Sequence, residues 1–120
     1  SGTVDSGITS SCVEMRFGGA QRNVVQHSLL SGCNFNGVNF ENGAIDNIIR
    51  NNRIGTTANG KVRLPNGVNG VQSNQADNNT IRDNTIVGGI YVGLVADDWV
   101  IEGNYIGTNP DDDDLANGLG

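Results

Sequence analysis

Basic residues and long apolar runs are scarce in this chain of 120 residues. Seven Lys and Arg are spread against 13 Asp and Glu, which leaves a net charge of −6 and no basic stripe of the kind that binds nucleic acid. No apolar run approaches the ~18 residues that a membrane-spanning helix needs. We therefore expect neither a nucleic-acid partner nor a membrane span.

Other missing features exclude several folds and sites. A single histidine, His27, disfavours a zinc site and a Ser-His-Asp triad. No window has apolar residues at i, i+3, i+4 and i+7, which argues against helices. The few Leu residues argue against leucine-rich repeats. The composition is instead rich in Gly and Asn, at 18 residues each, and both tolerate tight turns with positive φ.

A nine-residue phrase is present four times, beginning at Asn23, Asn47, Asn79 and Trp99. Aligned, the copies give two apolar columns with a polar column between them. The first apolar column is Val25, Ile49, Ile81 and Ile101, the polar column is Ser28, Asn52, Asn84 and Asn104, and the second apolar column is Leu30, Ile54, Ile86 and Ile106. Repetition at such intervals predicts a solenoid, in which each unit buries its apolar face against its neighbours. We expect the apolar columns to be buried and the amides to bond to one another at a bend.

Further short strands complete each unit. Residues 13–17, 38–40 and 90–92 alternate between apolar and polar side chains, as strands do. We expect about five rungs, divided near residues 24, 48, 80 and 100. Two insertions, around residues 56–67 and 110–117, are rich in turn residues, and solenoid insertions often gather on the binding face.

Two cysteines, Cys12 and Cys33, lie 21 residues apart, which is close to the length of one rung. Stacked strands are ~4.8 Å apart, within the Cα separation that a disulfide accepts. A disulfide would indicate an oxidising compartment. The alternative is a pair of buried free thiols that pack as small apolar side chains.

Three phrases resemble the repeats of the right-handed parallel β-helix, pectate-lyase-like superfamily: residues 79–86, residues 66–71 and Ile106-Gly107-Thr108-Asn109. The resemblance covers about residues 20–120 and implies an all-β, right-handed parallel β-helix with internal aliphatic stacks and an asparagine ladder. The family includes polysaccharide lyases, hydrolases, epimerases, phage tailspikes and bacterial surface proteins, so a secreted or cell-surface location follows but no single activity does. We predict one domain over residues 1–120, cut from a longer solenoid at both ends. In the column of Asn23, Asn47 and Asn79, Trp99 replaces the fourth amide, and we expect it to pack rather than to form an exposed sugar platform.

The acidic residues offer two candidate sites. Asp97-Asp98 matches the Asp-Asp pair of the family's polygalacturonase-type hydrolases, but no Gly-His-Gly accompanies it, and a polar turn before Trp99 is the alternative. The run Asp111, Asp112, Asp113 and Asp114 could bind a hard cation such as calcium, although it lacks the spacing of an EF-hand. The alternative is a loop whose charges repel one another. We expect no cofactor, with calcium as the one exception that the sequence allows.

The outward-facing positions next to the apolar columns form a candidate binding patch. Arg50, Arg53, Arg82 and Tyr105 could bind an anionic sugar by charge and stacking. The alternative is a solvated face with an Arg82–Glu102 ion pair that contributes little.

The sequence therefore favours a non-catalytic, secreted or cell-surface β-helix scaffold or adhesive module with weak affinity for polysaccharide. One alternative is a fragment of a polysaccharide lyase, glycoside hydrolase or epimerase. Another is a subunit that assembles end to end through the open edges of the solenoid.

Overall fold

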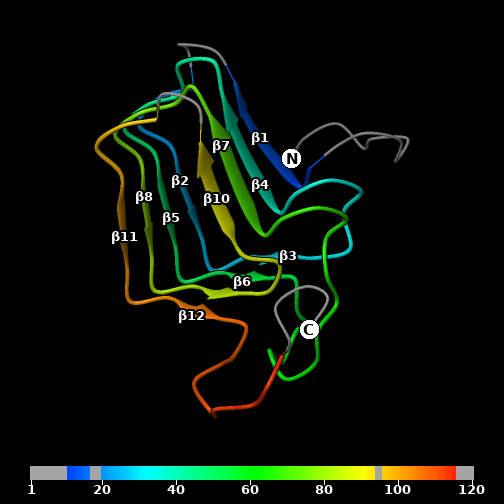
Figure 1. Ribbon diagram of the computed structural model, residues 1–120. Helices are drawn as coiled ribbons and strands as arrows, with labels where there is room; N and C mark the ends of the chain where they lie inside the picture. The colour runs from blue at the N-terminus through cyan, green and yellow to red at the C-terminus, as the bar shows by residue number, and fades with distance from the viewer. Residues whose placement is uncertain (1–10, 17–19, 94–95, 116–120) are drawn as a thin grey trace.

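The computed structural model describes residues 11–16, 20–93 and 96–115, and within them the chain forms β-strands joined by turns and contains no helix (Figure 1). No described segment is therefore a helix that could cross a membrane. The strands are β1 Val13–Arg16, β2 Val24–Gln26, β3 Leu29–Leu30, β4 Val38–Glu41, β5 Ile48–Arg50, β6 Arg53–Ile54, β7 Val71–Asn74, β8 Thr80–Arg82, β9 Thr85–Ile86, β10 Ile90–Gly93, β11 Val100–Glu102 and β12 Tyr105–Ile106.

These strands build three parallel sheets of four strands each (Figure 1). Sheet 1 contains β1, β4, β7 and β10, sheet 2 contains β2, β5, β8 and β11, and sheet 3 contains β3, β6, β9 and β12. Three consecutive strands, one from each sheet, make one turn of the coil. The chain is therefore a right-handed parallel β-helix, as predicted, and its described residues form four rungs. The expectation of about five was too high because the divisions fell inside rungs, so the last expected rung supplies only β11 and β12.

The two predicted isoleucine columns form the core of the coil. Ile49 pairs with Ile81 in sheet 2, Ile54 pairs with Ile86 in sheet 3, and all four side chains are fully buried. The predicted burial is wrong for Ile101 and Ile106, which are 43% and 42% exposed. They belong to the last rung, and no described rung lies beyond them to cover their outer side.

Glycines precede the sheet 1 strands because the backbone passes directly over the isoleucine column there. A Cβ on Gly37 would lie 2.4 Å from Cγ2 of Ile54, and a Cβ on Gly70 would lie 2.5 Å from Cγ2 of Ile86. Both separations are far below ordinary van der Waals contact. The repeated Gly-Val step is therefore a packing requirement of this corner.

Trp99 packs into the core from the last rung, as expected. Its indole meets the ring of Phe40 edge to face, with the ring centroids 5.0 Å apart, and its Nε1 donates a hydrogen bond of 2.7 Å to the carbonyl of Ala76. Phe40 lies two rungs away from Trp99, and its register partner in the intervening strand is the small residue Ser73. Ser73 is fully buried, and its hydroxyl has no hydrogen-bond partner in the described structure.

Asparagine ladders form at both bends that flank sheet 2. In the first ladder, Oδ1 of Asn47 accepts bonds from the backbone N–H and side-chain amide of Asn23, and Oδ1 of Asn79 accepts the same two bonds from Asn47. The second ladder repeats this pattern from Asn52 to Asn84 and from Asn84 to Asn104. Each internal amide is buried and fully bonded, so the ladders satisfy groups that would each cost ~1–3 kcal/mol if left unpaired.

Each ladder residue follows a residue in the left-handed backbone region. Before the first ladder these residues are Arg22, Asp46, Asn78 and Asp98, and before the second they are His27, Asn51, Asp83 and Gly103. All eight have φ between 54° and 66°. Asn, Asp and Gly tolerate this conformation best, which explains why they dominate the bends.

Candidate functional site

The four residues of the predicted binding patch lie in two outward rows on adjacent sheets. On sheet 2, strand register aligns Gln26, Arg50, Arg82 and Glu102. On sheet 3, it aligns Leu29, Arg53, Thr85 and Tyr105. The predicted residues are therefore neighbours in the fold, but the second ladder separates Arg50 and Arg82 from Arg53 and Tyr105.

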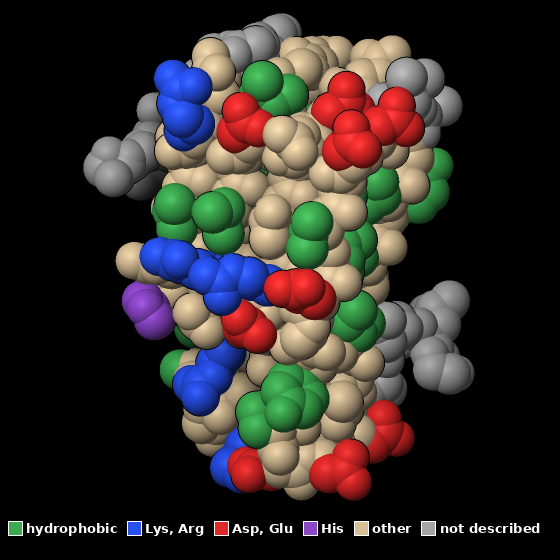
Figure 2. Space-filling view, turned by 90° about the vertical axis from the view of Figure 1, so that its left-hand side faces the viewer, with side chains coloured by type: hydrophobic (Ala, Val, Ile, Leu, Met, Phe, Trp, Pro, Cys, Tyr) green, Lys and Arg blue, Asp and Glu red, His purple; other side chains and the backbone are tan. Residues whose placement is uncertain are grey.

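The two arginines of the sheet 2 row are engaged by neighbouring side chains, and one of them is neutralised. Arg50 donates through Nε to Oε1 of Gln26 at 2.8 Å, and Arg82 forms an ion pair of 2.8 Å with Asp83. The Arg82–Glu102 pair considered from the sequence does not form within 4.0 Å, because Asp83 engages the guanidinium instead. Figure 2, which views this side, shows a row of basic side chains with acidic side chains directly beside it.

The sheet 3 row carries two hollows that share Arg53. One hollow, of about 370 Å³, is lined by His27, Ser28, Leu29, Asn51, Arg53 and Ala58. The other, of about 280 Å³, is lined by Arg53, Asn59, Gly60, Thr85, Asn109, Pro110 and Asp111. The guanidinium of Arg53 donates to the carbonyl of Ala58, which anchors the side chain between the hollows and leaves further N–H groups free to meet a ligand.

The two predicted insertions pack together beside this row. Lys61 in the first insertion forms an ion pair of 2.6 Å with Asp111 in the second, and Asn109 donates to the carbonyl of Gly60 at 2.8 Å. The hydrogen bond and the opposite charge raise the pKa of Lys61 and lower the pKa of Asp111. The insertions thus form one wall, which explains why Thr85, although it faces outward, is only 8% exposed.

The four consecutive aspartates do not converge on one point. Asp111 is engaged by Lys61, whereas Asp113 accepts a hydrogen bond from the side-chain amide of Asn109 at 2.9 Å. No group of three His, Cys, Asp or Glu side chains in the described part of the chain is arranged to hold a metal ion. Calcium binding by this run stays a prediction from the sequence.

Asp97 and Asp98 lie in the bend that leads into Trp99. The backbone N–H of Asp97 donates to Oδ1 of Asp77 at 2.7 Å, and Asp98 is the left-handed residue of the bend, with φ 59°. Neither carboxylate lines either hollow, and His27 belongs to the first rung, at the opposite end of the stack. Neither aspartate therefore has an acid/base partner among the described side chains that line the hollows.

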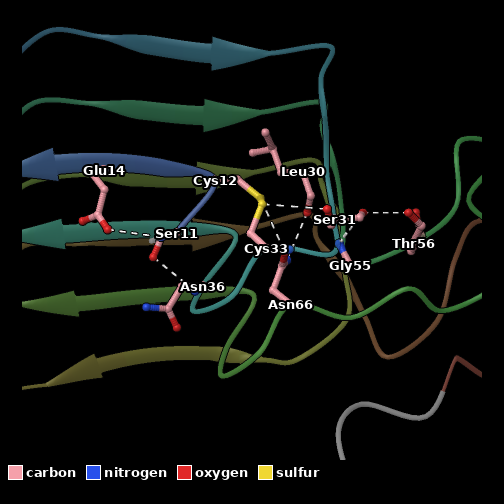
Figure 3. The surroundings of a disulfide bond; sticks show 10 residues. All are labelled: Ser11, Cys12, Glu14, Leu30, Ser31, Cys33, Asn36, Gly55, Thr56 and Asn66. Carbon is pink, nitrogen blue, oxygen red and sulfur yellow. Dashed lines mark hydrogen bonds between the residues drawn. A yellow bond between two sulfur atoms is a disulfide. The ribbon is translucent and has the colours of Figure 1, made fainter. Parts of the chain in front are cut away.

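A disulfide joins Cys12 to Cys33, with their Cα atoms 5.5 Å apart. It ties the start of sheet 1 to the segment that enters β4. Figure 3 shows Asn66 beside the bridge, where its Oδ1 accepts the backbone N–H of Cys33 at 2.8 Å and its Nδ2 donates to the carbonyl of Leu30 at 3.0 Å. The bridge and Asn66 together hold the inserted segment against the first two rungs.

The sequence did not indicate a polar cluster on the outer face of sheet 1. The side-chain amide of Asn39 donates to Glu14 and to Glu41, each at 3.0 Å, and Nε of Arg16 lies 3.1 Å from Glu41. The bond from Asn39, and then that from Arg16, lowers the pKa of Glu41. Nor did the sequence indicate that His27, Asn59 and Asn109 line the hollows; the insertions were the only signal that pointed to this side.

Comparison with known proteins identifies one matching family model, described as the periplasmic copper-binding protein NosD, over residues 3–115. No curated protein and no solved structure matches the chain. The periplasmic description agrees with the expected location outside the cytoplasm, and the match supports the expected β-helix repeat. The expected likeness to pectate lyases and to other carbohydrate-associated proteins stays a prediction.

The side chains of this chain do not fit a copper site. Copper prefers His, Cys and Met ligands, and the whole sequence has one His, two Cys and one Met. Both cysteines form the disulfide, Met15 is buried in the core, and His27 is exposed on the bend between β2 and β3. The family match therefore reflects the repeat that builds the coil, and not a set of copper ligands. Because the family model matches residues 3–115 and the described residues form a four-rung parallel β-helix, the chain belongs to the NosD family.

Proposed function

We propose that the chain is a non-catalytic periplasmic or surface-exposed scaffold that binds an anionic glycan weakly, in the groove over sheet 3. The observation that carries the proposal is the position of Arg53, which stands between two hollows that together extend along the row. A permanent positive charge at the centre of an elongated groove suits a polymer with a carboxylate or sulfate on its sugar units.

The rest of the groove suits sugar hydroxyls. The side-chain amide of Asn51 and the Nδ2 group of Asn59 offer hydrogen bonds, whereas Leu29 and Pro110 offer apolar surface for the faces of sugar rings. Tyr105, 43% exposed, ends the same row and can stack on a further ring. Arg50 lies across the bend and can add long-range attraction.

The absence of catalysis follows from the charges around the groove. A glycosidase or lyase needs a free acid or base beside the scissile bond. Asp111 and His27 are the acid/base side chains that line the groove in the described structure. Lys61 holds Asp111 as a charged ion pair, and no carboxylate lines the hollow that contains His27 to act with it. The β-helix then acts as a rigid support for a binding surface.

Binding should be measured by calorimetry with oligomers of pectin, alginate and chondroitin, and with dextran as an uncharged control. We expect weak binding of the anionic oligomers that fades as salt rises above ~0.15 M. Arg53→Ala should abolish it. Arg82→Ala is the matched control, because Asp83 already neutralises Arg82. Equal loss in both variants would contradict the groove, and steady release of unsaturated or reducing ends would contradict the non-catalytic reading.

A further inference from the structure

Thr85 carries a hydroxyl without a partner in the smaller of the two hollows. This residue faces outward from sheet 3 and lines the hollow, yet its exposed fraction is only 8%. Its backbone N–H donates to the carbonyl of Asn52 at 3.0 Å, as sheet pairing requires, but no described residue forms a hydrogen bond with its hydroxyl. Because nearly all buried polar groups are hydrogen-bonded, this hydroxyl indicates a place for a ligand group inside the hollow.

The guanidinium of Arg53 is fixed beside this hydroxyl. Arg53 and Thr85 are register partners in the neighbouring strands β6 and β9, whose backbones lie ~4.8 Å apart. The guanidinium donates to the carbonyl of Ala58, and Gly60 packs so closely against it that a Cβ there would lie 3.0 Å from Nε of Arg53. The loop therefore holds the positive charge in place before a ligand binds, which reduces the entropy lost on binding.

Other walls of the hollow offer groups that suit sugar hydroxyls. Oδ1 of Asn59 accepts bonds from Oγ1 of Thr57 at 2.8 Å and from the backbone N–H of Lys61 at 3.0 Å. Its Nδ2 has no partner among the described residues and can donate to a ligand. Asp111 is paired with Lys61 through Oδ2, so its other oxygen can accept a bond from a hydroxyl.

The arrangement suits a carboxylate better than a sulfate ester. The two coplanar oxygens of a carboxylate can both face Arg53 and Thr85, and a guanidinium favours such a planar partner. The three terminal oxygens of a sulfate ester point in different directions, so at least one would face the rest of the hollow. The same hollow contains the negative charge of Asp111, which disfavours a further anionic oxygen there.

We propose that the smaller hollow selects one uronic-acid unit of a glycan. Its carboxylate binds the guanidinium of Arg53 and accepts a hydrogen bond from the hydroxyl of Thr85, while its ring hydroxyls meet Asn59 and Asp111. A volume of about 280 Å³ suits one sugar ring, since it lies just below the ~300–1,000 Å³ of pockets for larger ligands. The inference rests on the glycan binding proposed above and specifies its ligand as a polyuronate, with Thr85 as the residue that determines the preference.

The preference should be measured by calorimetry with short oligogalacturonates and with sulfated galactan oligomers of equal length and charge. We expect the parent chain to bind the oligogalacturonates at least tenfold more tightly. Thr85→Val replaces the hydroxyl by a methyl group of similar size and should remove most of this advantage, by about tenfold in affinity, as for one lost hydrogen bond to a charged group. Thr85→Ser keeps the hydroxyl and should retain the preference.

Thr80→Val is the matched control, because it makes the same change on the outer face of sheet 2, away from both hollows. It should leave the affinity unchanged. Thr85→Val should unfold at the same urea concentration as the parent chain, since the hydroxyl that it removes has no partner among the described residues.

Two kinds of failure can be told apart. Equal affinity for the two oligomers, or unchanged affinity for oligogalacturonate in Thr85→Val, would overturn this inference and leave the glycan-binding function standing. A loss in Thr80→Val or Thr85→Ser as large as that in Thr85→Val would also overturn it. If the parent chain binds no anionic glycan at all, the proposed function itself is wrong, and this inference falls with it.

Discussion

The asparagine ladder makes a quantitative prediction at Asn84. This residue is 1% exposed and its side chain forms four hydrogen bonds: two accepted from Asn52, one donated to the carbonyl of Ile49 and one donated to Asn104. In Asn84→Ala, the backbone N–H of Asn52 stays buried without a partner, and the side-chain amide of Asn52 and the carbonyl of Ile49 each lose one bond. At ~1–3 kcal/mol for the unpaired donor and ~0.5–1.5 kcal/mol for each lost bond, the free energy of unfolding should fall by about 2–6 kcal/mol. Since small domains are stable by only ~5–15 kcal/mol, this loss is large.

Urea unfolding can measure this loss through the fluorescence of Trp99, the only tryptophan, which moves from its contact with Phe40 into water. Asn104→Ala is the matched control. The same ladder continues through Asn104, but this residue lies in the uncovered last rung, where water can replace the lost bonds, so we expect less than half the effect. A loss below ~1 kcal/mol in Asn84→Ala, or equal losses in both variants, would refute the reasoning that burial makes these bonds valuable.

Four further outcomes are expected. Ser73→Ala removes a buried hydroxyl without a partner, so unfolding free energy should stay unchanged or rise by up to ~1 kcal/mol, and a clear loss would argue for an undetected bond. Because Asn39 lowers the pKa of Glu41, the stabilisation from this carboxylate should be complete above its usual value of 4.5 and should be lost as pH falls through the lowered value; Glu41→Gln should flatten that part of the stability curve. Replacing Cys12 and Cys33 together by Ala should cost about 3 kcal/mol by the loop-entropy estimate for their separation of 21 residues, measured by thermal unfolding. After incubation with copper and desalting against a chelator, the oxidised protein should retain no metal, and stoichiometric retention would contradict the poor fit of its donors.

Much of the coil could be predicted from the sequence because its rungs repeat the same side chains at the same places. The recurrence of Ile49, Asn52 and Ile54 in each repeat already predicted two inward-facing columns with a bend between them. The contact between Trp99 and Phe40 could not be predicted, since it depends on the small side chain of Ser73 in the rung between them. Nor does the repeat distinguish an internal rung from a terminal one, which is why Ile101 was expected to be buried.

The sequence predicted which side chains of the candidate site face outward, but not which of them are free to bind a ligand. The pattern correctly placed Arg50 and Arg82 next to each other on the outer face of sheet 2. Whether these arginines can bind a ligand depends on their other partners. The ion pair between Arg82 and Asp83 was not predicted, because the sequence analysis compared only residues aligned across neighbouring strands. The pairing of Lys61 with Asp111 joins residues 50 positions apart whose segments share no charge pattern, so only the folded stack reveals it.

The separation between ladder partners changes from 24 to 32 to 20 residues along the stack, although the ladder bonds themselves stay alike. The corner from sheet 3 to sheet 1 absorbs most of this variation, since it runs through residues 31–37, 55–70 and 87–89 in successive rungs, whereas the corner from sheet 2 to sheet 3 always has two residues. Doubling the length of a flexible loop costs only ~0.6 kcal/mol of closure entropy, which is small beside the ladder bonds of a single rung. Residues 57–65 can therefore be exchanged for segments of other lengths while the coil keeps its register, so the recognition surface of such a protein can diversify without renewed selection on its fold.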